Sequence, residues 1–152
     1  MRPRIVALAA TALAVVSLGL AACSSTSADS TGVSASQAVA GALVAPTSPQ
    51  RVDVEQFAEI VASPQSIVID VRTPEEFAAG HLEGAVNYNV EGPDFASQIA
   101  ALDPADVYAV YCRSGNRSQV AVAQMQKIGI NGIYELQTGF NAWQEAGYPV
   151  VY

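Results

Sequence analysis

The stretch VYAVYCRSGNRS, residues 107–118, joins an unbroken apolar run to a short polar loop. Runs of β-branched and aromatic residues without polar interruption are typical of strands that are buried on both faces. A cysteine follows the run directly, and two of the seven basic residues of the chain lie within the next five positions. The stretch therefore predicts a central strand that delivers a thiol to the beginning of a helix.

Similar apolar runs alternate with helical patterns on both sides of this stretch. We expect further strands over 67–71, 85–88 and 133–136, and helices over 54–62, 74–79, 94–102, 118–128 and 140–146. Strands that alternate with helices predict an α/β domain with a mostly parallel central sheet and helices on both faces.

Two local patterns support the helices. Thr73, followed three positions later by Glu76, is a capping box, in which each side chain bonds the backbone N–H of the other residue. In the helix expected over 118–128, Ala121, Met125 and Ile128 recur at a spacing that puts them on one face. We expect that face to pack against the sheet.

The thiol lies where parallel sheets bind ligands, beyond the carboxyl end of a strand and before a helix. Gly115 lets the loop backbone turn its N–H groups inward. Amide hydrogen bonds, the positive end of the helix dipole and nearby guanidinium groups all favour the charged form of a thiol. We therefore expect Cys112 to be largely thiolate at neutral pH.

The N-terminus has the pattern of an export signal. Arg2 and Arg4 precede an apolar run over 5–20, which is short for a membrane-spanning helix. The following LAAC ends at Cys23 and resembles the bacterial lipoprotein pattern, which implies cleavage before a diacylated cysteine. The alternative is an ordinary cleaved signal with an incidental cysteine. We expect an exported lipoprotein that is anchored on the extracytoplasmic face of the cell envelope.

Composition divides the chain into three parts. Residues 1–22 form the signal peptide, and residues 23–50 follow as the lipidated cysteine and a Ser-, Thr-, Ala- and Gly-rich tether. The tether is too poor in charge and in aromatic residues to bury a core, so we expect it to be disordered, although a helix over 36–45 is an alternative. Residues 51–152 suffice for one small domain.

Charge and cysteine content exclude several classes of partner. Of seven basic residues, removal of the two in the signal leaves five, against fourteen acidic ones, a formal charge of −9. Such a chain repels nucleic acid and anionic membrane surfaces, so membrane attachment must come from the lipid. One histidine and one unpaired cysteine do not make a metal site, and we expect neither a metal nor a cofactor.

Three motifs, in order, make the part from residue 51 onward similar to a rhodanese domain. The active-site loop is matched by residues 112–118, the upstream signature by 70–77 with 80–85, and the downstream signature by 139–143 with 147–150. Glu83 and the connection over 91–93 depart from the common pattern, and neither lies in the loop.

The resemblance implies a small domain that carries sulfane sulfur as a persulfide on Cys112. The pocket residues that it implies are Arg113, Ser114, Gly115, Asn116 and Arg117. Their backbone N–H groups would cradle the sulfur, and Arg117 would close the loop and add positive charge. The implied partners are a small anionic donor such as thiosulfate and an acceptor that is cyanide or a small-molecule or protein thiol. We expect a monomer.

Four other conspicuous residues have structural interpretations. We expect His81 to stabilise a turn, Asp70 and Arg72 to form an ion pair or turn hydrogen bonds at a strand end, and Trp143 to pack in the core.

Two other functions compete with sulfur transfer. A cysteine phosphatase or arsenate-reductase relative would also use a thiolate, a helix N-terminus and an arginine. Loops of that kind place five residues between cysteine and arginine, whereas four separate Cys112 from Arg117. The other alternative is a redox-sensing or protein-binding module that holds persulfide without turnover.

Overall fold

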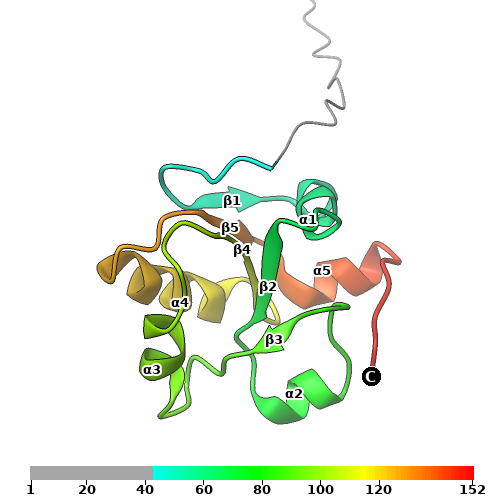
Figure 1. The fold of residues 1–152 in the computed structure, drawn as a ribbon. Coiled ribbons are helices and arrows are strands. Elements are labelled where there is room, and N and C mark those ends of the chain that lie inside the picture. Colours follow the sequence, from blue (N-terminus) through cyan, green and yellow to red (C-terminus); the bar gives the residue numbers. More distant parts are fainter. Residues whose placement is uncertain (1–42) are drawn as a thin grey trace, which may run out of the picture. The chain divides into compact units, whose positions relative to one another are not determined.

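The computed structural model describes residues 43–152, and its regular elements form one α/β domain (Figure 1). The strands are β1 (Gln50–Val52), β2 (Ser66–Asp70), β3 (Val86–Asn87), β4 (Val107–Tyr111) and β5 (Ile133–Leu136). The helices are α1 (Val54–Val61), α2 (Pro74–Ala78), α3 (Phe95–Ala100), α4 (Asn116–Lys127) and α5 (Gly139–Glu145).

The strands form one sheet in the order β1-β5-β4-β2-β3. Every pairing between neighbouring strands is parallel. Helices α3 and α4 pack on one face, and α1 and α5 pack on the other. The predicted fold class, a parallel sheet with helices on both faces, is therefore confirmed.

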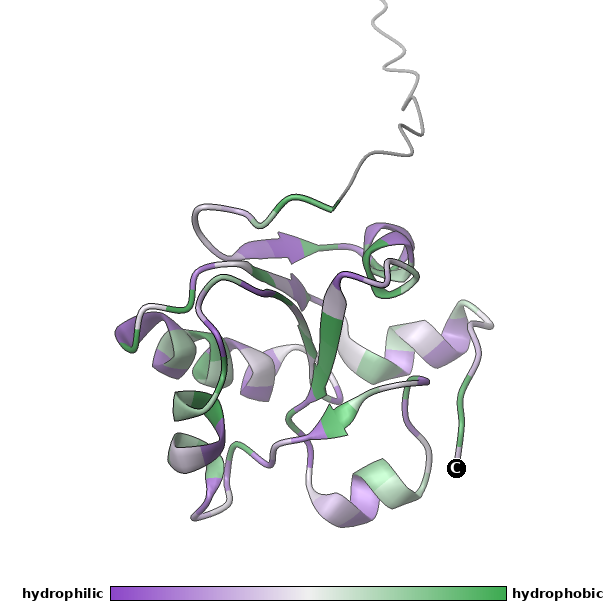
Figure 2. Ribbon diagram, viewed as in Figure 1, coloured by the Kyte–Doolittle hydropathy of each residue, from purple (hydrophilic) through white to green (hydrophobic). Residues whose placement is uncertain are grey.

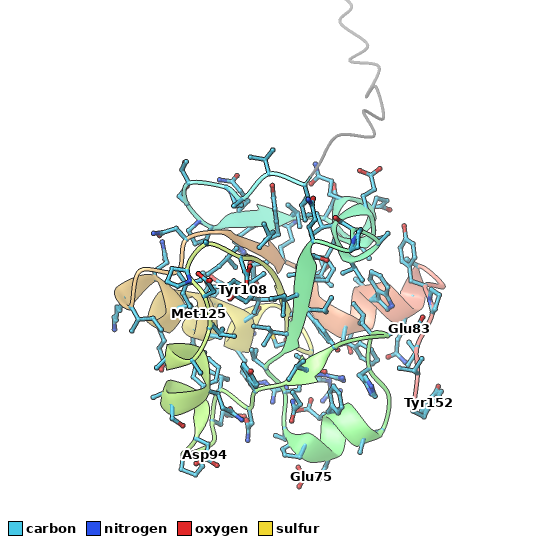
Figure 3. The ribbon with its side chains drawn as sticks, in the orientation of Figure 1. Glu75, Glu83, Asp94, Tyr108, Met125 and Tyr152 are labelled. Atoms are coloured by element: carbon cyan, nitrogen blue, oxygen red, sulfur yellow. The ribbon has the colours of Figure 1, made fainter. Side chains whose placement is uncertain are left out.

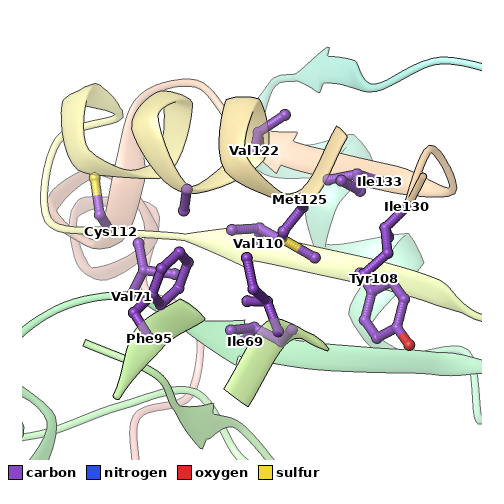
Figure 4. Packing of buried hydrophobic residues seen from close by; sticks show 12 residues of the cluster. Ile69, Val71, Phe95, Tyr108, Val110, Cys112, Val122, Met125, Ile130 and Ile133 are labelled. Carbon is purple, nitrogen blue, oxygen red and sulfur yellow. The ribbon is translucent and has the colours of Figure 1, made fainter. Parts of the chain in front are cut away.

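The central strand β4 contributes to both cores because its side chains alternate between the two faces. Tyr108, Val110 and Cys112 lie in the core beneath α3 and α4, whereas Ala109 and Tyr111 lie in the core beneath α1 and α5. Figure 4 shows the first of these cores. Cys112 thus points toward α4 because of its position in the alternation of β4.

Hydropathy follows the same layers. Figure 2 shows green and purple alternating along the helices, as expected for helices with one face on a core. Tyr108 and Met125 are fully buried inside the domain, while Tyr152 lies at its rim with 87% of its surface exposed (Figure 3).

Most of the expected elements differ from the structure by one or two residues at an end. The strand β1 was not expected, because it is short and buries only Val52. Helix α4 begins at Asn116 and ends at Lys127, not over 118–128. Ile128 therefore follows the helix and is 46% exposed, which corrects its assignment to the buried face, whereas Ala121 and Met125 are buried as expected.

The last part of the expected tether contacts the domain. The Leu43 N–H donates to Gln65 Oε1 at 2.7 Å, and the Tyr134 hydroxyl donates to the Val44 carbonyl at 3.0 Å. Leu43 also packs against the core beneath α1 and α5. These contacts place Leu43 and Val44 against the domain.

The expected signal peptide, Cys23 and the tether up to residue 42 lie outside the described residues. Within the described part of the chain, no helix combines the length and the apolar character needed to cross a membrane.

Candidate active site

The site lies at the point where the strand order reverses. Strands β2 and β4 are neighbours, but the chain continues from β2 to β3 at one edge and from β4 to β5 on the opposite side. Such a switch point leaves a crevice beyond the carboxyl ends of the two strands, where ligands bind in open parallel sheets. Cys112 follows β4 directly and therefore stands at this crevice.

The Cys112 sulfur has two hydrogen-bond partners. The Gly115 N–H donates to Sγ at 3.2 Å, and the Ser118 hydroxyl oxygen lies 3.5 Å from Sγ. The residue is 1% exposed, and Figure 4 shows its sulfur beneath the first turn of α4. The sulfur therefore sees the positive end of the helix dipole. The expectation of a thiolate relied on several backbone N–H groups that donate to the sulfur. Among the described residues, only the Gly115 N–H does so.

Two glycines hold the loop against the end of β5. Gly115 has φ +84°, and a Cβ added there would lie 2.0 Å from the Gln137 carbonyl oxygen. Gly139 has φ +70°, and a Cβ there would lie 2.5 Å from the backbone of Arg113 and Ser114. Both positions require glycine, since their backbone is left-handed and their neighbours are backbone atoms. The bond from Gly115 to the sulfur depends on this close approach.

Arg117 is clamped by carboxylates. Its Nη1 and Nη2 donate to the two oxygens of Glu76 at 2.7 and 2.8 Å, and Nη1 also lies 3.3 Å from Glu91 Oε2. The hydrogen bonds from Arg117 lower the pKa of Glu76 to about 2, and those to Glu76 raise the pKa of Arg117. Arg117 thus fixes the first turn of α4 to α2. Its positive charge, expected to act on the thiol, is largely matched by these two carboxylates.

Arg113 is the exposed cation of the loop. No salt bridge joins it to another of the described residues. A hollow of about 270 Å³ lies beside it, with the lining Arg72, Glu76, Ala79, Arg113, Phe140, Asn141 and Gln144. A guanidinium at the rim of this hollow can attract a small anion.

A buried ion pair supports the floor of that hollow. Arg72 donates from Nε and Nη2 to the Asp70 carboxylate, and its Nη2 also donates to the Gly80 carbonyl at 2.7 Å. Its guanidinium lies 4.0 Å from the centroid of the Phe140 ring. Burial disfavours the charge of Arg72, but hydrogen bonds and charge from Asp70 outweigh it and raise the pKa of Arg72. The predicted structural role of this pair is confirmed.

The other two structural interpretations are also confirmed. His81 Nδ1 lies 3.0 Å from the Phe77 carbonyl, and its ring stacks on Phe77 with centroids 3.7 Å apart. Trp143 is 5% exposed, and its Nε1–H donates to the Pro149 carbonyl at 2.9 Å. Neither side chain reaches Cys112.

Sequence reasoning missed two polar residues behind the sulfur. The Ser118 hydroxyl donates to Glu135 Oε1 at 2.6 Å, and Glu135, 1% exposed, is bound by Arg51 from β1. The sequence does contain a signal, because Glu135 is an acidic residue inside the otherwise apolar pattern over 133–136. A carboxylate at such a position needs a buried partner. No group of three or more potential metal ligands occurs among residues 43–152.

The fold and the site define a small parallel α/β domain with a buried cysteine at the switch point of its sheet. The family model of the rhodanese-like domain matches residues 53–146. The chain therefore belongs to the rhodanese-like domain family, and the resemblance of its three motifs is confirmed.

Several of the similar proteins are sulfurtransferases by name. Thiosulfate sulfurtransferase 16, chloroplastic, of Arabidopsis thaliana is 37% identical over 91 residues, which cover 53% of this chain and 76% of the relative. Thiosulfate sulfurtransferase GlpE of Pseudomonas putida is 34% identical over 100 residues, or 66% of this chain and 88% of the relative. The chain thus belongs with a sulfurtransferase family.

Solved structures have the same fold. A rhodanese-related protein from Thermoplasma volcanium is 30% identical, with a TM-score of 0.60 and coverage of 67% of this chain and 97% of that one. A protein from Lactobacillus plantarum is 26% identical, with a TM-score of 0.57 and coverage of 67% and 87%.

Proposed function

We propose that this domain is a sulfurtransferase that carries sulfane sulfur as a persulfide on Cys112. The donor is a small anion of the thiosulfate type, and the acceptor is a thiol or cyanide. The observation that carries this proposal is the position of Cys112 at the switch point, where its Sγ accepts a hydrogen bond of 3.2 Å from the Gly115 N–H. The names of the two similar thiosulfate sulfurtransferases support the same reaction.

The reaction has two steps. In the first, the Cys112 thiolate attacks the outer sulfur of thiosulfate. A new S–S bond forms, the bond from that sulfur to the sulfonate breaks, and its electron pair leaves with sulfite. In the second, the acceptor attacks the outer sulfur of the persulfide, and Cys112 leaves as a thiolate. Arg113 attracts the anionic donor to a chain that is otherwise acidic.

The contacts of Arg117 argue against the phosphatase alternative. A phosphoryl group needs a free guanidinium fork to bind its oxygens. Both ends of the Arg117 fork are bound by Glu76, and Glu91 contacts it as well. The loop is also one residue short of the phosphatase spacing. We therefore propose sulfur transfer in preference to phosphate ester hydrolysis.

The place of action is a separate proposal. The sequence of residues 1–23 supports export and a lipid anchor on Cys23, with the domain on the extracytoplasmic side of the membrane. Within the domain, the chain enters β1 at the amino end of the sheet, opposite the carboxyl ends that hold the cysteine.

The test of the proposed function is thiosulfate:cyanide transfer by the purified protein and by Cys112→Ser. We expect turnover to thiocyanate by the wild type and loss of at least about 99% of it in the variant, since a hydroxyl is a far weaker nucleophile at neutral pH. Aryl phosphate hydrolysis should be negligible in both. Transfer that persists in Cys112→Ser, or phosphate hydrolysis as fast as sulfur transfer, would refute the proposal.

A further inference from the structure

A chain of contacts leads from the cysteine to a buried carboxylate and then to the surface. Cys112 Sγ lies 3.5 Å from Ser118 Oγ, and Ser118 Oγ lies 2.6 Å from Glu135 Oε1. The other carboxylate oxygen of Glu135 accepts a bond of 2.5 Å from Arg51 Nε. Cys112, Ser118 and Glu135 are each at most 1% exposed, whereas the Arg51 side chain is 48% exposed.

The direction of these bonds follows from the number of hydrogens. A serine hydroxyl has one hydrogen to donate and can accept through its lone pairs. Glu135 is an acceptor while it is ionised, so the single hydrogen of Ser118 is donated to Glu135. Ser118 therefore presents a lone pair to the sulfur, and Cys112 is the donor, as an S–H group. This geometry thus holds Cys112 as a thiol that is aimed at a carboxylate through one hydroxyl, and not as the thiolate expected from the sequence.

We propose that Glu135 receives the thiol proton of Cys112 through Ser118 when the thiolate forms. The S–H bond breaks as a new O–H bond forms on Ser118 Oγ, and the original Ser118 proton moves to Glu135 Oε1. Ser118 then donates to the thiolate sulfur, and the neutral Glu135 donates to Ser118. Glu135 is a positioning residue in this step, since it acts on the sulfur through Ser118.

The transfer conserves charge within the pair of Cys112 and Glu135, but it acts against the ion pair with Arg51, which favours the ionised form of Glu135. The net charge of Cys112 with Glu135 is the same before and after the transfer, so the thiolate can form without a proton leaving to bulk water. The charged groups nearest the pair are Arg51 from β1, Arg113 from the loop, Arg117 from α4 with Glu76 and Glu91, and the buried pair Asp70 and Arg72 at the end of β2. The carboxylates of Glu76, Glu91 and Asp70 each face an arginine, and Glu135 faces both Arg51 and the Ser118 hydroxyl.

The test measures alkylation of Cys112 by iodoacetamide as a function of pH. Iodoacetamide is neutral and reacts with thiolate, so its rate needs neither donor binding nor sulfur transfer. In the wild type we expect a pH-independent limb below about pH 8, where a free thiol is protonated. In Glu135→Gln and Ser118→Ala the alkylation rate should instead keep falling as the pH is lowered. At pH 6 it should be lower than in the wild type by roughly tenfold or more. At alkaline pH the three rates should converge.

The controls separate the relay from charge and from packing. Glu145→Gln makes the same charge change at an exposed position of α5, and Ser97→Ala removes an exposed hydroxyl from α3. Both should keep the wild-type profile. The double variant Ser118→Ala with Glu135→Gln should be no slower than the slower single variant, because both changes interrupt one path. If Glu135→Gln does not fold, Ser118→Ala alone carries the test.

Three results would overturn the relay. The first is faster alkylation of Glu135→Gln than of the wild type at acid pH, which simple removal of a negative charge predicts. The second is an equal loss of alkylation rate at every pH. The third is a loss of rate in the double variant that equals the sum of the losses in the single variants. The relay rests on the proposed function only in taking Cys112 as the reacting group. Failure of sulfur transfer with the acid limb intact would refute the proposed function and leave the relay standing.

Discussion

Gly115 determines the shape of the loop after Cys112 because a side chain at its position has no room. Its left-handed backbone brings its N–H within 3.2 Å of the Cys112 sulfur, and its α-carbon faces the Gln137 carbonyl across the gap to β5. Loop, sulfur and strand end are therefore held together at one residue. Gly147 shares the left-handed conformation, but a Cβ there would meet nothing within 4 Å.

These two glycines make a matched pair of substitutions. Gly115→Ala should lower the free energy of unfolding by at least about 2 kcal/mol and reduce sulfur transfer at least tenfold, because the loop must move away from Gln137. Gly147→Ala should lower the free energy of unfolding by only about 1 kcal/mol, because alanine disfavours the left-handed backbone, and it should leave activity unchanged. Chemical denaturation and turnover measure both effects. Equal losses of stability and activity in the two variants would contradict this account of the loop.

Between elements, the ion pair of Glu76 and Arg117 joins the first turns of α2 and α4. Glu76 also closes the capping box with Thr73, which confirms the predicted start of α2. The Glu76 side chain thus caps the start of α2 and also holds α4 against α2. The pKa of Glu76 is lowered from 4.5 to about 2, chiefly by its hydrogen bonds with Arg117. The stabilisation of the folded domain by this ion pair is therefore complete above about pH 4.5 and is lost as the pH falls toward 2.

Glu76→Gln tests this link because glutamine can still complete the capping box. At pH 7 we expect the free energy of unfolding to fall by about 1 to 2 kcal/mol, less than the pKa shift alone would give, because both side chains are about a quarter exposed and water screens the pair. The difference from wild type should shrink as the pH falls from 4.5 toward 2. Urea denaturation at several pH values measures it.

The control is Glu59→Gln, which removes one negative charge from an exposed position of α1. It should change stability by less than about 0.5 kcal/mol at either pH. A Glu76→Gln difference that stays constant between pH 7 and pH 3 would show that the ion pair does not carry the effect.

For the whole molecule, the domain and the proposed anchor are separable. The described domain has its own two cores, one on each face of the sheet. Cys23→Ala should therefore abolish acylation and leave the melting temperature of the domain unchanged. Intact mass and detergent partitioning of the exported protein measure the first effect, and thermal denaturation measures the second. A Cys23→Ala protein that still carries diacylglycerol would refute the lipid anchor.

The sequence predicted the parts of the domain that depend on local pattern. The bounds expected for β4 and β5 match the structure. β4 is an unbroken apolar run, and β5 is an apolar run that only Glu135 interrupts. The strand β1 and the contacts of Leu43 depend on pairing with distant β5 and the core, which no local pattern reports. Cys112 was placed correctly at a strand end before a helix. Glu135 was missed because its role arises only when β5 lies beside β4 and beneath α4.

The central claim is that Cys112 carries sulfur, and the intact mass of the protein after incubation with thiosulfate tests it most directly. We predict the added mass of one sulfur atom, located on the peptide that contains Cys112, removed by cyanide or a thiol and absent in Cys112→Ser. No added mass on the wild type, or an added sulfur that persists in Cys112→Ser, would contradict the claim.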